Sequence, residues 1–199
     1  NRMSVFLDGA FAFGIDAFSL YKLKLQEHDE IDAATLQEIK NTVLYEDAKA
    51  YAAKLLSVRS YTERDMHRKL KDRTGSGFVA DKTVAFLKEY KLIDDAEYAH
   101  RYASDCLRLK KLGRVGIKMK LLEKGIDRQL AEQVIEALNC QEEEAENLEA
   151  LMRKKLAGNF ALKNRMKAKR YFASKGYRFD DIDTTLKKLT AQEEDGSSC

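Results

Sequence analysis

Few side chains in this sequence could perform catalysis or bind a metal, and their spacing gives them ordinary structural roles. The glycine-rich run at residues 74–77 is followed by Phe78, where a phosphate-binding loop needs a lysine. The three histidines lie far apart, with no cysteine or carboxylate at ligand spacing. Asp94 and Asp95 are best explained as the start of a helix, where carboxylates cap backbone N–H groups. We therefore predict a protein that is not an enzyme, with no catalytic residue, metal or cofactor.

Positive charge is the stronger signal, because it is concentrated in two segments. The formal net charge is only +3, but residues 101–128 hold nine Lys or Arg against three acids, and residues 150–179 hold ten and no acid. Residues 1–46 and 190–199 are acidic. Natural surfaces usually mix both signs, so this concentration indicates a functional basic face. Such a face suits nucleic-acid phosphates or an acidic protein groove, and the residues do not distinguish these partners.

The elements that position these charges are expected to be mostly helices, because the chain has no proline and 35% of its residues are charged. The exception is the N-terminus. Alternating apolar residues over 2–15, around the turn Asp8-Gly9, predict a β-hairpin. Asp32 is placed to cap a helix with an apolar face. Together these features predict a small acidic unit over residues 1–46.

From residue 47 onward the apolar spacing is helical and recurs about every fifty residues. The pattern at residues 48–55 returns at 99–106 and, more weakly, at 145–152. In each copy a second helix is expected to end near a glycine that an apolar residue follows. These glycines are Gly77, Gly125 and Gly176. Three helices per period are typical of a tandem array.

The predicted fold class is therefore mainly α: a tandem array of three-helix units (three repeats), preceded by a small N-terminal β-hairpin plus helix unit. The acidic run at residues 142–144 is expected to be a solvated helix start. The predicted boundaries are 1–46 for the N-terminal unit, 47–93, 94–140 and 141–190 for the three repeats, and 191–199 for a flexible tail.

Cysteine use and hydropathy indicate the compartment. The three cysteines, at positions 106, 140 and 199, show no C-x-x-C spacing. An odd count without a disulfide framework argues for reduced thiols in the cytoplasm. No apolar run approaches membrane-spanning length. We expect a cytoplasmic monomer without a membrane partner.

Several segments resemble the RecX regulators of the RecA recombinase. LLSVRSYTERDMHRKL at residues 55–70 is similar to the signature of their first unit, and LIDDAEYA at 92–99 to the entry of their second. GRVGIKMKLLEKGI at 113–126 resembles their most characteristic segment, whereas the third unit matches more loosely around residues 171–177. The resemblance covers about residues 47–189, and the hairpin unit resembles an extension of some longer members. The departures are an insertion at 72–76 and the degenerate third unit.

The resemblance implies an all-α array that binds the RecA–DNA filament and inhibits RecA activity in recombination, DNA repair and the SOS response. The implied partners are the RecA filament and, in a weak and salt-dependent way, single- or double-stranded DNA. We expect these residues to contribute to the contact: Arg59, Arg68, Arg101, Arg108, Lys111, Arg114, Lys118, Lys124, Lys167 and Arg170. Reversing Arg114 and Lys118 to glutamate is expected to weaken RecA inhibition without unfolding the protein.

Two alternatives remain open from the residues. One is a direct DNA-binding protein of tandem three-helix units, which would bind DNA without RecA and with steep salt dependence. The other is a helical protein-interaction scaffold without a nucleic-acid role, which would bind a protein partner and no DNA.

Overall fold

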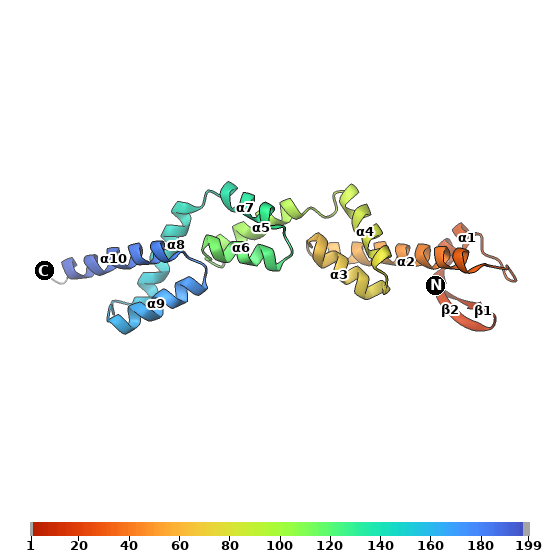
Figure 1. The fold of residues 1–199 in the computed structure, drawn as a ribbon, viewed down its shortest axis with the longest axis horizontal. Helices are drawn as coiled ribbons and strands as arrows, with labels where there is room; N and C mark the ends of the chain where they lie inside the picture. Colours follow the sequence, from red (N-terminus) through yellow and green to blue (C-terminus); the bar gives the residue numbers. More distant parts are fainter. Residues whose placement is uncertain (1, 197–199) are drawn as a thin grey trace. The chain divides into compact units, whose positions relative to one another are not determined.

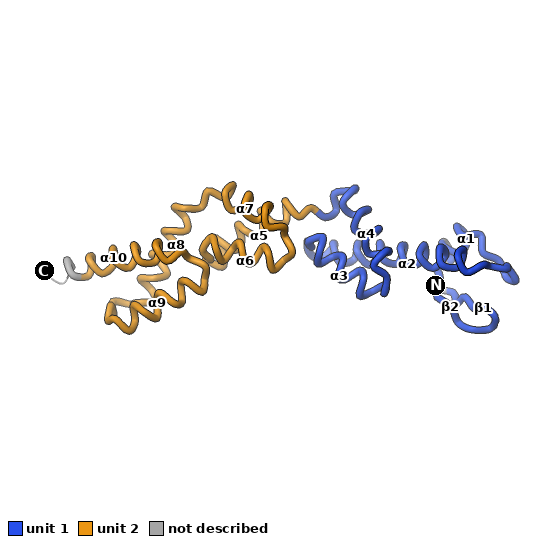
Figure 2. Tube along the Cα trace, viewed as in Figure 1, with its two compact units in different colours: residues 1–93 blue, residues 94–199 orange. Residues whose placement is uncertain are grey.

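The computed structural model describes residues 2–196, and these form ten helices and one two-stranded antiparallel sheet (Figure 1). This confirms the predicted fold class. The chain divides into two compact units, residues 1–93 and residues 94–199 (Figure 2). Among residues 2–196, none of the helices combines the length and apolar character that crossing a membrane requires.

Unit 1 begins with the predicted hairpin, which is confirmed. Strands β1 (Arg2–Leu7) and β2 (Ala10–Asp16) pair in antiparallel register, with a bulge between Val5 and Phe6. Asp8 and Gly9 both have positive φ, at 47° and 80°, as a tight two-residue hairpin turn requires. The short helix α1 (Ala17–Leu23) follows. A small core forms where Ile15 of β2 packs with residues of the next helix.

That next helix, α2 (Ala33–Leu56), serves two cores. Its start is capped as predicted, because an Asp32 carboxylate oxygen accepts the backbone N–H of Thr35 at 2.8 Å. Ile39 and Val43 pack against the hairpin, whereas Ala48 and Ala52 pack in the next core. The boundary predicted between residues 46 and 47 therefore falls inside a continuous helix, and no linker separates the two parts.

Helices α3 (Glu63–Thr74) and α4 (Gly77–Glu89) complete the second core of unit 1. Here the sequence assigned the wrong glycine to the end of the second helix. Gly75, with φ of 68°, ends α3, whereas Gly77 is the first residue of α4. The reason is Ser76, whose hydroxyl accepts the backbone N–H of Val79 and so starts a new helix. Phe78 is consequently 62% exposed and does not join the core.

Unit 2 contains six helices around two cores. The first core lies between α5 (Asp95–Arg108), α6 (Arg114–Glu123) and α7 (Arg128–Ala137). The second lies between α8 (Gln141–Leu156), α9 (Leu162–Ser174) and α10 (Phe179–Gly196).

The local signals of unit 2 behave as predicted. Asp94 accepts two backbone N–H groups at the start of α5, and Asp127 does the same for α7. Gly125 and Gly176 have φ of 90° and 82°, so the turns after α6 and α9 both use the left-handed conformation that glycine adopts readily.

Candidate functional site

The ten predicted contact residues fall in both units. Two lie in unit 1. Arg59, after α2, places its guanidinium 4.6 Å from the ring centroid of Tyr61. Arg68, on α3, forms an ion pair of 2.8 Å with Asp65 and is mostly exposed. The remaining eight lie in unit 2.

On α5 of unit 2, two predicted arginines are largely exposed, and each lies more than 3.5 Å from the nearest carboxylate oxygen of its ion pair. Arg101 lies 3.7 Å from Glu97, and Arg108 lies 3.6 Å from Glu143. Exposed pairs of this kind add little to folding stability. Both side chains are therefore largely accessible to solvent.

Two predicted lysines flank α6 and contact aromatic residues. Lys111 has a positive φ of 50°, and its backbone carbonyl accepts the hydroxyl of Tyr177 at 3.0 Å. Lys124, at the end of α6, places its ammonium group 5.9 Å from the ring centroid of Tyr102. Lys111 thus contributes its backbone to the packing of unit 2, and its side chain stays partly exposed.

Arg114 has a different environment from the one predicted. Its Nε lies 2.7 Å from a carboxylate oxygen of Glu144, and its backbone N–H donates to the other oxygen at 3.0 Å. Its guanidinium also lies 3.9 Å from Asp181. Glu144 is only 2% exposed, so the expectation of a solvated acidic helix start at residues 142–144 is wrong at this position.

The burial of Glu144 follows from its contact with the start of α6, where its carboxylate replaces an N-cap side chain. The N-cap of α6 is Gly113, which has no side chain to accept a backbone N–H. The carboxylate of Glu144 reaches across from α8 and supplies the acceptor, at the end of the helix where negative charge is favoured. The positive charge of Arg114 is therefore paired with a buried carboxylate of unit 2.

Three glycines bring the start of α6 against the turn between α9 and α10. The N–H of Gly113 donates to the carbonyl of Lys175 at 3.1 Å, and the N–H of Val115 donates to that of Gly176 at 3.2 Å. A Cβ on Gly176 would lie under 3.0 Å from the backbone of Gly116, and a Cβ on Gly113 would meet the carbonyl of Gly176 in the same way. Close backbone approach thus explains these glycines.

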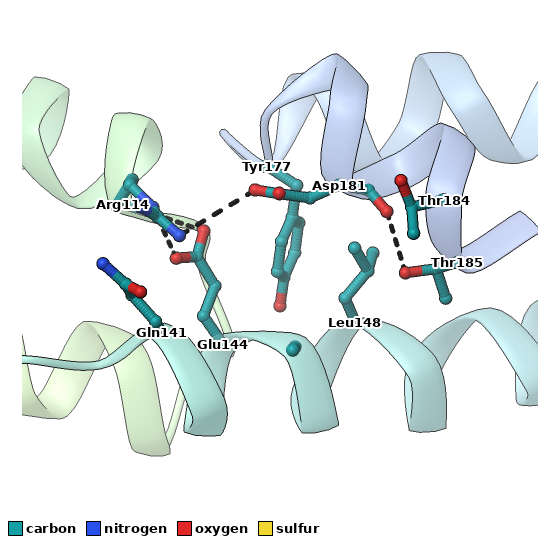
Figure 3. A pocket seen from close by; sticks show the side chains of 9 residues that line it. Arg114, Gln141, Glu144, Leu148, Tyr177, Asp181, Thr184 and Thr185 are labelled. Carbon is teal, nitrogen blue, oxygen red and sulfur yellow. Dashed lines mark hydrogen bonds and ion pairs between the residues drawn. The ribbon is translucent and has the colours of Figure 1, made fainter.

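A cavity of about 260 Å³ lies beside this junction, between α6, α8 and α10 (Figure 3). Arg114 and Glu144 face each other at one end of it, and Asp181 and Tyr177 lie along its wall. Burial raises the pKa of Tyr177 to about 12, and the negative charge of Glu144 adds to the shift. Arg114 binds Glu144 and lies near Asp181, whereas the Tyr177 hydroxyl donates to the backbone carbonyl of Lys111, so these groups form no nucleophile–base pair. Within the described part of the chain, no cluster of three or more His, Cys, Asp or Glu is arranged to hold a metal.

The cations of α6 and α9 differ in their partners. On α6, Lys118 lies 2.6 Å from Glu132, and Lys120 lies 2.7 Å from Glu123. On α9 only Lys169 has such a partner, Asp183 at 2.7 Å. The exposed cations of α9 form no ion pair with any described side chain. They are Lys163, Lys167 and Arg170.

Sequence reasoning included Lys167 and Arg170 but missed Lys163, although its spacing of four and seven residues from them places all three on one helical face. It also missed Val115 and Met119, which are 49% and 54% exposed on α6. Their spacing of four residues was the signal that places them on one helical face.

Comparisons with known proteins agree with this architecture. The family model described as the second three-helix domain of RecX matches residues 94–135, and the one for the N-terminal domain of regulatory protein RecX matches residues 1–32. The regulatory protein RecX of Clostridium perfringens (strain SM101 / Type A) is 30% identical, covering 97% of this chain and 92% of its own. That of Caldanaerobacter subterraneus subsp. tengcongensis is 27% identical, covering 94% and 92%.

Two crystal structures share the fold. A regulatory protein RecX superposes with a TM-score of 0.70 at 22% identity, covering 92% of both chains. RecX from Lactobacillus salivarius gives a TM-score of 0.67 at 24% identity, covering 74% of this chain and 97% of its own. With a 30% identical relative matched over nearly its whole length, this chain belongs to the RecX family of regulatory proteins.

Proposed function

We propose that this protein binds the RecA recombinase–DNA filament and inhibits RecA activity in recombination, DNA repair and the SOS response. The observation that carries the proposal is its similarity to regulatory RecX proteins over 97% of the chain. The exposed cations on α5 and α9 support it, because a filament that contains DNA presents negative charge along its length. The protein acts by binding and not by catalysis.

The proposed setting is the cytoplasm, with the protein acting as a monomer. Cys106 and Cys140 are both buried free thiols, which supports a reducing environment. Burial raises the pKa of both thiols, so neither is activated as a nucleophile.

The test is RecA ATPase activity on single-stranded DNA with this protein titrated in. Inhibition is expected at or below one protein per RecA subunit. If stoichiometric amounts of the protein do not inhibit RecA ATPase activity, the proposal is wrong.

A charge-reversal variant sharpens this test, but Arg114 is unsuitable for it. A glutamate at position 114 would add a carboxylate beside Glu144 and Asp181, so loss of inhibition would not be separable from loss of folding. The double variant Arg101→Glu/Arg108→Glu avoids this problem, because both side chains are mostly exposed. It is expected to weaken inhibition at matched salt. Lys54→Glu/Lys187→Glu, which changes charge equally at exposed positions outside the predicted contact, serves as the control.

A direct DNA-binding protein is the second candidate, and the unpaired cations of α9 favour it. It differs from the leading proposal in one measurable way. It would bind DNA without RecA and leave RecA ATPase unchanged once DNA is in excess.

A further inference from the structure

Helix α9 places three cations in one row on its exposed side. Lys163, Lys167 and Arg170 are separated by four and three residues, the spacing of neighbours on one helical face. On the opposite side Ala168 and Phe172 are buried in the second core of unit 2, which fixes the direction of the row. The row spans about 10 Å at roughly 1.5 Å per residue. Over that length of duplex axis one strand of B-form DNA carries about three phosphates, at a rise of roughly 3.4 Å each.

Among the side chains that the structure describes, none neutralises the row. Residues 150–179 contain no acid, and the acids of α10 that reach toward α9 meet Lys169 and not the row. Like charges three and four residues apart repel each other and weaken a helix. A row of this kind does not serve folding, so its charge is available to a ligand.

Tyr171 extends the positive edge of α9. Its ring is 39% exposed, and the ammonium groups of Lys155 and Lys175 lie 3.9 Å and 5.5 Å from its centroid. Lys155 comes from the end of α8 and Lys175 from the end of α9. Proteins that bind single-stranded nucleic acid along its backbone combine cations with aromatic rings in the same way.

The alternative ligand, a protein surface, fits α6 better than α9. All three cations of α6 are paired within unit 2, and Val115 and Met119 are exposed between them. Low net charge with exposed apolar side chains is the character of a protein interface. On α9, Leu162 and Met166 are also exposed, but at 100° per residue they lie to one side of the cationic row.

We infer that the exposed face of α9, formed by Lys163, Lys167 and Arg170, is the surface of this protein that binds nucleic-acid phosphates. The inference rests on the proposed function for its biological setting and deepens it by assigning one ligand to one helix. The contact is sequence-independent, because it involves the backbone of the nucleic acid and not its bases.

The experiment measures binding of the full chain to a fluorescently labelled oligothymidylate by anisotropy, without RecA, over a salt series. The variant is Lys163→Gln/Lys167→Gln/Arg170→Gln. Losing three phosphate contacts should make the slope of log K against log salt shallower by about 2, at roughly 0.7 per contact on single strands. Affinity at low salt should fall about tenfold or more. The control, Lys54→Gln/Lys71→Gln/Lys187→Gln, removes the same charge from exposed positions elsewhere and should leave the slope unchanged.

Three outcomes overturn the inference: wild-type protein that does not bind the oligonucleotide, a variant on α9 that keeps the wild-type slope, and a control that loses as much affinity as the variant. A fourth is a variant with unchanged DNA affinity but weaker binding to DNA-free RecA, which would assign the face to an acidic protein. RecA ATPase measured in parallel separates this result from the proposed function. If wild-type protein fails to inhibit RecA while the α9 variant alone loses DNA binding, the proposed function fails and the assignment of α9 stands. Circular dichroism confirms that each variant is folded.

Discussion

Helices α6 and α9 are the middle helices of the two cores of unit 2, and they use positive charge in opposite ways. All three cations of α6 lie within 2.7 Å of a carboxylate oxygen, and two of those carboxylates come from other helices. The row on α9 has no such partner among the described side chains. Both helices are basic as sequences, so what distinguishes a structural charge from a surface charge is the position of acids in the fold. The following substitutions would break or sharpen this comparison.

The largest effect is expected at the glycines that seat α6. Gly176→Ala should lower the free energy of unfolding by roughly 2–5 kcal/mol, adding about 1–2 kcal/mol for the left-handed backbone to about 1–3 for overpacking. The added Cβ would collide with the backbone of Gly116, which cannot move aside as a side chain can. Urea denaturation gives the total loss, and hydrogen exchange of α6 and α9 peptides locates it.

Gly75→Ala is the matched control, because Gly75 also has a positive φ but a Cβ there meets nothing within 4 Å. It should cost only the backbone component, about 1–2 kcal/mol. Equal losses in the two variants would show that backbone conformation, and not close approach of α6, explains Gly176.

The buried ion pair of α6 comes next. Glu144→Ala should cost about 2–4 kcal/mol, somewhat less than a fully buried pair because Arg114 is a quarter exposed. Part of the loss arises because the backbone N–H of Arg114 loses its acceptor. Glu132→Ala removes the exposed partner of Lys118 and is expected to cost much less, about 0.2–1 kcal/mol. If the two variants unfolded alike, Arg114 would belong with the surface cations.

Local signals made much of the fold predictable. The caps at Asp94 and Asp127 and the glycine turn at Gly125 each depend on a few adjacent residues, so the sequence contains the whole cause. The error at Gly77 has the same origin. Two glycines lie two residues apart, and the cap formed by Ser76 decides which one ends α3.

The candidate site was less predictable, because its causes are distant in the sequence. Glu144 lies thirty residues from Arg114, and as part of an acidic run it matches an ordinary exposed helix start. Only packing of α8 against α6 reveals that it is buried. Conversely, the row on α9 could be predicted in part from the sequence. Residues 150–179 contain no acid, so in any fold the cations of this segment have no ion-pair partner within it.

A substitution at Tyr177 should have a smaller effect on the contact between the start of α6 and the turn before α10. Tyr177→Phe removes the hydrogen bond to the carbonyl of Lys111 and should cost about 0.5–1.5 kcal/mol at pH 7. In the folded state the pKa of Tyr177 is raised to about 12, from an ordinary value near 10. Between these pH values the unfolded chain releases the phenol proton and the folded chain keeps it, so stability falls as pH rises.

The wild-type protein should therefore lose about 1 kcal/mol through Tyr177 by pH 11, a loss that the phenylalanine variant does not share. Urea denaturation of both proteins from pH 7 to pH 11 measures the difference, and lysine titration affects both alike. The difference in free energy of unfolding between the two proteins should become smaller above pH 10. A difference that stays constant would mean that the Tyr177 hydroxyl is hydrated in the folded protein.

The smallest expected effect has the opposite sign and lies on α9. Lys167→Gln removes the repulsion of Lys167 by two like charges, those of Lys163 and Arg170. It should raise the free energy of unfolding by a few tenths of a kcal/mol, at about 0.2–0.5 per pair. The gain should shrink as salt rises, because the charges are exposed. Lys118→Gln on α6 removes an ion pair and should lower stability slightly instead. Chemical denaturation at two salt concentrations compares them. A loss of stability for Lys167→Gln would reveal a structural role for the row. A gain would mean that the cations of α9 lower the stability of the fold. Such a cost is expected of a binding surface, and it is not expected of α6, whose cations are paired with carboxylates.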